Sequence, residues 1–179
     1  MPDRLRFLTD KLATPIGDLV LICDEEGRLR ATDWTNYDER MRRLLERHYG
    51  EGNVTVTAAQ DPFGLTSALA AYFAGDLHAI DALPVATAGS AFQKSVWEAL
   101  RLIPTGQTIS YGQLALRLGK PAAVRAVGLA NGANPIGVVV PCHRVIGANG
   151  SLTGYGGGLE RKRWLLNHES RQGLLAVSF

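Results

Sequence analysis

The sequence predicts an α/β domain with a small antiparallel sheet at residues 1–88, followed by a mainly α, winged helix-turn-helix domain at residues 89–179. Three observations support this. Short apolar or alternating runs between turn signals fill the first half, as in a small sheet. Helical spacing with paired start signals begins at Ser90. The charge balance also reverses, from nine basic and fourteen acidic residues in 1–90 to ten basic and three acidic residues in 91–179.

The first half is expected to contain a hairpin, because the runs DLVLICD (18–24) and RLRATDW (28–34) are separated by a turn-like EEG. The elements expected next are an Arg-rich helix from about Tyr37 to Tyr49, a strand at 53–58, a helix at 65–75 closed by its glycine, and a connector at 76–89.

Two capping boxes mark the helices of the second half, SAFQ (90–93) and SYGQ (110–113). Gly119 ends the second helix, and Pro121 suits the first position of a third, PAAVRAVGLANG (121–132). Three further elements are expected after it: a strand at 136–140, a glycine-rich wing at 147–158 and a last helix at 159–168.

A helical wheel of the third helix, at about 100° per residue, leaves Val124 and Val127 on a buried side. A bare small-residue face lets a backbone come close to a duplex, which suits the minor groove. Alternatively, alanine is present only as a good helix former. The expected outward face comprises Ala122, Arg125, Ala126, Leu129 and Ala130.

Composition indicates a globular chain, with 179 residues and 46% hydrophobic content. No apolar run reaches bilayer length and the start lacks a secretory signal pattern, so we expect a cytoplasmic protein. The basic second half favours a nucleic-acid partner, with a solvated basic face as the alternative. The two cysteines have no metal-ligand spacing, so no zinc site is expected.

The candidate nucleophile is Cys142, in the stretch VVVPCHRVIG (138–147). His143 and Arg144 follow it directly, and a cationic or hydrogen-bonding setting favours the reactive thiolate. Without such neighbours, a cysteine after an apolar run would be an inert core residue. Cys23, inside an apolar strand, is assigned to the core.

A cysteine–histidine pair needs a third group to orient the imidazole. Glu169 lies four residues after Leu165 and three after Leu166, so it shares the helix side that these leucines would bury. A carboxylate there would point inward and need a partner. The alternative is an exposed residue at a fraying helix end.

These segments resemble the O6-alkylguanine-DNA alkyltransferase family, most closely its bacterial Ogt-type members. PCHRVIG (141–147) is similar to that family's active-site signature, and RAVGLANGANPI (125–136) and GYGGGLERKRWLLNHE (154–169) flank it in the expected order. FQKSVWEAL, IPTGQTISYGQLA and ATPIGDLVLICDEEGRL also match, so the similarity covers essentially the whole chain. The resemblance implies a ribonuclease H-like first domain.

The resemblance also implies DNA repair by direct damage reversal. A methyl or other alkyl group would pass from O6-alkylguanine, and also from O4-alkylthymine, in double-stranded DNA to Cys142. The implied protein is a monomer that flips the damaged base, uses no cofactor or metal, and binds no membrane. A thioether has no carbonyl for water to attack, so each molecule would act once.

The implied roles are given residue by residue: His143 takes the thiol proton through a water, Glu169 orients His143, Asn134 holds the turn around the site, Tyr111 assists the leaving guanine, and Arg125 fills the gap left by the flipped base. The implied pocket residues are Val145, Tyr155, Gly156, Gly157 and Gly158. Many relatives have serine where this chain has Gly156, which removes a possible hydrogen bond to the guanine oxygen.

Other functions stay open at this point. A cysteine hydrolase would use the same constellation but turn over repeatedly. A non-catalytic relative that binds alkylated DNA would lack the cysteine, and a two-headed adaptive-response regulator would carry an extra zinc domain. Individually, Tyr111 could be a core tyrosine, Asn134 a turn former and the glycines a flexible wing tip.

Overall fold

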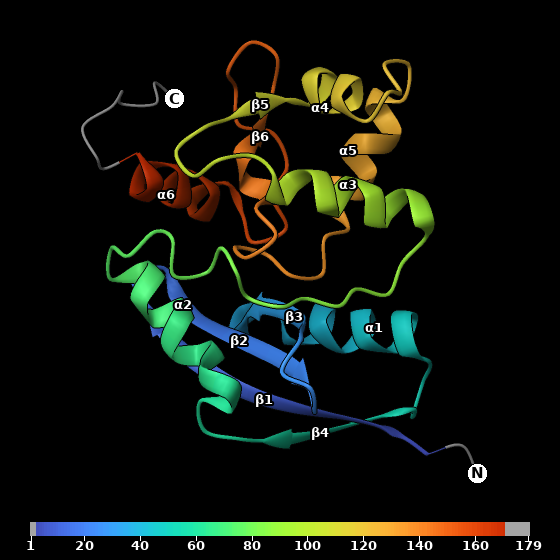
Figure 1. Ribbon diagram of the computed structural model, residues 1–179, viewed down its shortest axis with the longest axis vertical. Helices are drawn as coiled ribbons and strands as arrows, with labels where there is room; N and C mark the ends of the chain where they lie inside the picture. Colours follow the sequence, from blue (N-terminus) through green and yellow to red (C-terminus); the bar gives the residue numbers. More distant parts are fainter. Residues whose placement is uncertain (1–2, 171–179) are drawn as a thin grey trace. The chain divides into compact units, whose positions relative to one another are not determined.

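A computed structural model describes residues 3–170 of the chain. The chain divides into two units, Met1–Gly89 and Ser90–Phe179, and each is described here by itself (Figure 1). The predicted fold class, a small sheet with helices followed by a mainly helical unit, is confirmed. Among the helices within residues 3–170, none has the length and apolar character needed to cross a bilayer.

The first unit is built on a four-stranded sheet in the order β3-β2-β1-β4. Its β2–β3 hairpin lies where the turn signal predicted it, but β1 pairs parallel with β4, so the sheet is mixed and not wholly antiparallel. The chain crosses through helix α1 between β3 and β4, and such a crossover allows parallel pairing. The elements are β1 (Leu5–Thr14), β2 (Gly17–Asp24), β3 (Leu29–Trp34), α1 (Asp38–Tyr49) and β4 (Val54–Ala58).

Strand β1 was not predicted, and its burial explains why. Phe7 is the only fully buried residue among its ten, and charged residues interrupt the strand, so neither an apolar run nor a regular alternation marks it. Hydrophobic periodicity in a sequence reflects the burial of side chains. Strand β1 is instead stabilised by backbone hydrogen bonds to a neighbouring strand on each of its edges, which this pattern does not show.

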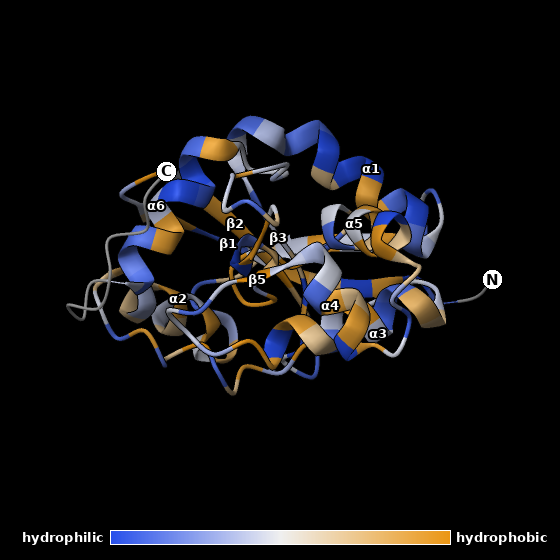
Figure 2. Cartoon of the chain, turned by 90° about the horizontal axis from the view of Figure 1, so that it is seen from above, coloured by the Kyte–Doolittle hydropathy of each residue, from blue (hydrophilic) through white to orange (hydrophobic). Residues whose placement is uncertain are grey.

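Helices α1 and α2 (Leu65–Phe73) pack on opposite faces of the sheet. Met41 of α1 packs with Ile22 of β2, whereas Phe73 of α2 meets Trp34 of β3 edge-on at 6.4 Å between ring centroids. Trp34 pairs with Leu19, which lies on the other side of β2 from Ile22. Figure 2 shows α1 as a mainly hydrophilic helix with a few hydrophobic positions, as expected for a helix with one buried side.

The second unit begins with the two predicted capping boxes. Ser90 caps α3 (Ala91–Arg101), and Ser110 caps α4 (Tyr111–Arg117). In each box the serine Oγ accepts a hydrogen bond from the main-chain nitrogen of a glutamine three residues later, at 3.1 Å. The remaining elements are β5 (Ile109–Ser110), α5 (Val124–Gly132), η3 (Cys142–Arg144), β6 (Val145–Ile146) and α6 (Leu159–Glu169), with β5 and β6 paired in parallel.

Helix α5 begins at Val124 and not at Pro121, because α4 ends in a glycine cap that redirects the chain. Gly119 has φ of 70°, and the main-chain nitrogen of Lys120 bonds to Ala115 O at 2.9 Å. A turn follows, closed by a hydrogen bond from Ala123 N to Lys120 O. This turn takes up the residues that were expected to form the first helical turn.

The apolar run at 136–140 is buried but is not the predicted strand. It winds through tight turns, with Val140 N bonded to Ile136 O at 2.9 Å and Val138 at a left-handed φ of 72°. A short apolar run signals burial without fixing the backbone geometry, and here the polar contacts come from a neighbouring asparagine side chain.

Candidate active site

The nucleophile candidate Cys142 is the first residue of the short 3-10 helix η3, directly before β6. Turns precede it on the chain, and Cys142 N bonds to Val140 O at 2.8 Å. The residue is only 8% exposed. A reaction at this sulfur therefore takes place in a largely desolvated setting.

His143 and Glu169 are brought together from η3 and the last turn of α6. His143 Nε2 lies 2.8 Å from Glu169 Oε1, and the side chains are 0% and 1% exposed. The leucine spacing on α6 had placed Glu169 inward, and it is buried there. Within residues 3–170, the buried Nδ1 of His143 has no hydrogen-bond partner, so this second ring nitrogen is the one left to accept a proton.

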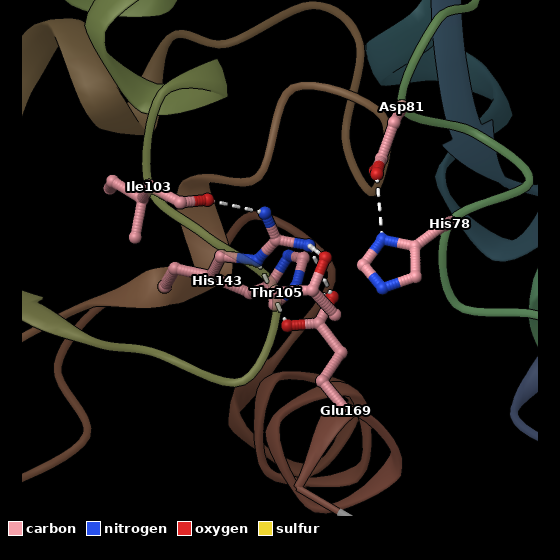
Figure 3. Close-up of polar contacts among 7 residues, drawn as sticks. His78, Asp81, Ile103, Thr105, His143 and Glu169 are labelled. Atoms are coloured by element: carbon pink, nitrogen blue, oxygen red, sulfur yellow. Dashed lines mark hydrogen bonds and ion pairs between the residues drawn. The ribbon is translucent and has the colours of Figure 1, made fainter.

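Arg144 binds the same carboxylate as His143. A cationic or hydrogen-bonding setting was expected for the thiol, and the Arg144 guanidinium binds both oxygens of Glu169 at 2.9 Å. It also donates to Ile103 O at 2.8 Å and to Thr105 Oγ1 at 3.3 Å (Figure 3). Burial alone would raise the pKa of Glu169, but the charges and hydrogen bonds of His143 and Arg144 outweigh burial and hold that pKa well below its ordinary value.

The sequence analysis missed the buried cation of the site, Lys162. Its side chain is 0% exposed, and its Nζ donates to Val145 O at 2.6 Å and to Thr153 O at 2.8 Å. Burial lowers the pKa of Lys162 to about 8, and the charge of the Cys142 thiolate acts in the opposite direction. The ammonium charge of Lys162 therefore favours the thiolate.

A sequence signal for Lys162 did exist. Lys162 precedes Leu165 by three residues, Leu166 by four and Glu169 by seven, so it shares the buried side of α6 with all three. Because Arg161 and Arg163 flank Lys162, the three residues together have the pattern of a solvent-exposed basic run. The spacing that identified Glu169 would also have identified Lys162.

Two asparagines hold the backbone around Cys142. Asn134 Nδ2 donates to Val140 O at 2.7 Å, and Asn134 Oδ1 accepts from Ile136 N at 3.0 Å, so this side chain spans the turns before the nucleophile. Asn131, which the sequence analysis did not single out, is 3% exposed, and its Nδ2 lies 3.5 Å from Cys142 O.

Tyr111 is the first residue of α4, and its hydroxyl contacts the segment between β6 and α6. The phenol donates to Thr153 O at 3.4 Å and accepts from Thr153 Oγ1 at 3.3 Å. Thr153 thus lies between Tyr111 and the buried Lys162. Of the expected pocket residues, Val145 and Gly157 are buried, Tyr155 and Gly158 are partly buried, and Gly156 is exposed.

The outward face of the third helix differs in part from the wheel. Arg125, Ala126 and Leu129 are exposed on α5, with Leu129 at 71%. Ala122 is exposed but lies in the turn before the helix. Ala130 is buried, and its carbonyl accepts from Trp97 Nε1 at 2.8 Å.

The buried side expected for that helix holds Val127 only, because Val124 is 40% exposed. Ala122 was misplaced because α5 starts only at Val124, so a wheel that includes Ala122 assigns helical geometry to a turn. Within the helix the buried residues are Val127, Ala130 and Asn131.

Cys23 lies in β2 and is fully buried, as assigned. Burial, with a smaller contribution from Asp24, raises the pKa of its thiol to about 11. Cys23 is therefore kept as an unreactive thiol, in contrast to Cys142 beside its histidine.

Fold and site together define a two-unit protein whose helical unit carries a buried cysteine next to a buried histidine–carboxylate pair. Two family models match the chain: the 6-O-methylguanine DNA methyltransferase ribonuclease-like domain at residues 8–87, and the DNA binding domain of the same protein at residues 91–171. The chain belongs to the 6-O-methylguanine DNA methyltransferase family.

Individual relatives agree. The chain is 58% identical over 165 residues to the methylated-DNA–protein-cysteine methyltransferase of Salmonella typhimurium, covering 92% of this chain and 96% of the relative. The crystal structure of Mycobacterium tuberculosis O6-methylguanine methyltransferase matches with a TM-score of 0.76 at 38% identity, over 96% and 97% of the two chains. A Mycobacterium tuberculosis OGT structure in complex with DNA matches with a TM-score of 0.74 at 39% identity, over 95% and 96%.

Proposed function

We propose that this protein repairs DNA by moving a methyl or other alkyl group from the O6 atom of guanine to Cys142. The observation that carries the proposal is the buried His143–Glu169 pair, joined at 2.8 Å, directly beside a cysteine in the DNA binding domain of this family. The relatives are named methylated-DNA–protein-cysteine methyltransferases, which supports alkyl transfer from DNA to a cysteine.

The chemistry is an in-line substitution at carbon. The Cys142 sulfur forms a bond to the alkyl carbon as the bond from that carbon to guanine O6 breaks, and the electron pair stays on the base. His143 accepts the thiol proton, guanine takes up one proton from solvent and ends neutral, and His143 then releases its proton to solvent, so the protons balance. Tyr111 donates a hydrogen bond to the leaving base, which lowers the energy of its developing charge. The product thioether offers water no carbonyl to attack, so the thiol is not regenerated.

DNA handling is assigned to α5. Arg125 and Ala126 are exposed on this helix, and a helix with small side chains suits close approach to the minor groove. Arg125 would fill the space of the extruded nucleotide. Asn134 and the pocket residues around Tyr155 keep the roles given by the family resemblance, and O4-alkylthymine as a second substrate, the monomeric state and a cytoplasmic location stay predictions.

Intact-mass measurement tests this function. After incubation with duplex DNA containing O6-methylguanine, the protein should gain one methyl group, located on Cys142 by peptide mapping, and Cys142→Ser should gain none. The amount of repaired DNA should never exceed the amount of protein. Repeated turnovers with unmodified protein would instead indicate a hydrolase, and binding without a mass change would indicate a damage-recognition module.

A further inference from the structure

Thr153 contacts the Tyr111 hydroxyl directly. It lies outside the active-site signature at 141–147, and the proposed function assigns it no role. It lies in the segment between β6 and α6. Its Oγ1 donates to Tyr111 Oη at 3.3 Å, and its carbonyl accepts from the same phenol at 3.4 Å. The phenol of Tyr111 is therefore both donor and acceptor toward this one residue.

The main chain at Thr153 is held independently of the Thr153 side chain. Lys162 Nζ, fully buried, donates to Thr153 O at 2.8 Å and to Val145 O at 2.6 Å, with a longer contact to Gly154 O at 3.5 Å. The buried ammonium thus fixes the Thr153 carbonyl against β6. The threonine side chain is exposed, so removing its hydroxyl leaves this anchor in place.

The two Tyr111–Thr153 hydrogen bonds are longer than the common O–H···O distance of about 2.7–2.8 Å, so they cost little to exchange. Catalytic hydrogen bonds are often long before substrate binds and tighten in the complex. The Tyr111 proton can therefore turn from the Thr153 carbonyl to the leaving base, while the Thr153 hydroxyl goes on donating to the phenol oxygen.

We propose that Thr153 is a positioning residue for Tyr111, whose hydroxyl orients the phenol and strengthens it as a donor to the leaving guanine. As Tyr111 shares its proton with the base, negative charge builds on Oη, and a hydrogen bond received there stabilises that charge. Hydrogen bonds linked in a chain polarise one another in this way. This inference rests on the proposed function, because it requires a base that leaves.

The test compares Thr153→Val, which keeps the branched shape, with Thr153→Ser, which keeps the hydroxyl. Single-turnover rates on O6-methylguanine duplex, at saturating protein, should fall about two- to tenfold for Thr153→Val, as expected for one neutral hydrogen bond. Thr153→Ser should stay near the parent rate. Ser151→Ala is the matched control, since it removes a hydroxyl from the same segment that does not contact Tyr111.

A double-mutant cycle separates this role from a general effect on the segment. In a Tyr111→Phe background, Thr153→Val should slow transfer no further, because the hydroxyl it supports is gone. Alkylation of Cys142 by iodoacetamide, which involves no leaving base, should be unchanged in Thr153→Val.

If Thr153→Val reacts at the parent rate while Tyr111→Phe reacts slowly, the inference about Thr153 is wrong and the role of Tyr111 still stands. Equal slowing by Thr153→Val in both backgrounds would overturn it too, and would place the effect in the segment itself. A parent rate for Tyr111→Phe would overturn both the inference and the role proposed for Tyr111.

Discussion

Arg144 and Glu169 are joined at two points, Nε to Oε2 and Nη2 to Oε1, both at 2.9 Å. Because Oε1 also contacts His143 at 2.8 Å, one buried carboxylate serves the arginine and the histidine together. Arg144 thereby fixes the plane of the carboxylate that orients the imidazole. Arg144, two positions after Cys142 in the chain, is thus joined to a residue twenty-five positions further along.

Glu169→Gln is expected to slow alkylation and to move its pH dependence to higher pH, because the imidazole loses its orienting anion and the pKa of the Cys142 thiol rises. The measurement is the single-turnover rate across pH, with circular dichroism to show that the variant is folded. A pH–rate profile that matches the parent would show that Glu169 is not coupled to Cys142.

Because of the Glu169 carboxylate, the free energy of unfolding should decrease at acidic pH. The folded-state pKa of Glu169 lies below its ordinary value of 4.5, so its stabilising contribution is fully present above that pH and is lost as the pH falls below it. At pH 7, Glu169→Gln should lower the free energy of unfolding by about 3 kcal/mol, since Arg144 is left buried with a neutral partner. Urea unfolding at several pH values should show this difference shrinking toward pH 3, and a constant difference would contradict the assignment.

Lys162→Met should affect both stability and reactivity. The carbonyls of Val145 and Thr153 lose their donor, which should cost about 1–3 kcal/mol of unfolding free energy. Loss of the buried positive charge should also slow the reaction of Cys142 with iodoacetamide, because the thiolate is less favoured. The neighbouring exposed Arg163→Met is the control, and an unchanged iodoacetamide rate in folded Lys162→Met would limit Lys162 to a structural role.

Arg125→Ala should separate base extrusion from chemistry. If Arg125 offsets the few kcal/mol that unstacking a base costs, the variant should repair duplex DNA slowly yet react almost normally with free O6-benzylguanine, provided the pocket admits this base. The informative quantity is the ratio of the two rates, at saturating DNA. Equal losses would mean that Arg125 supports the active-site fold, and no loss in either would mean that α5 does not enter the groove.

The local signals in the sequence were sufficient for much of this site. The capping boxes predicted where α3 and α4 begin, and the leucine spacing of α6 predicted that Glu169 is buried. Both signals depend only on residues within one or two helical turns. Contacts made by backbone atoms from elsewhere could not be read in this way. The spacing on α6 indicates that Lys162 is buried, but it does not show that Nζ donates to the carbonyls of Val145 and Thr153.

The same limit explains the errors in backbone geometry. The wheel of the third helix failed at Ala122 because the cap at Gly119 and the turn after it shift the start of α5. It failed at Ala130 because that residue packs inward, where its carbonyl accepts from Trp97 Nε1. The run at 136–140 has the composition of a strand, but Asn134 supplies polar contacts that a neighbouring strand would otherwise provide. In both segments the residue types did not determine the backbone conformation.

Because the two cysteines differ in reactivity, a count of titratable thiols shows how many protein molecules have already been alkylated. Cys23 is buried and its pKa is about 11, so in the native state at neutral pH a thiol reagent should label Cys142 alone, whereas the unfolded chain exposes both. The native-to-unfolded ratio of titratable thiols is then one half for fresh protein. Alkylation of Cys142 takes the native count to zero and the unfolded count to one, so colorimetry alone reports what fraction of a sample has already reacted, without labelled DNA.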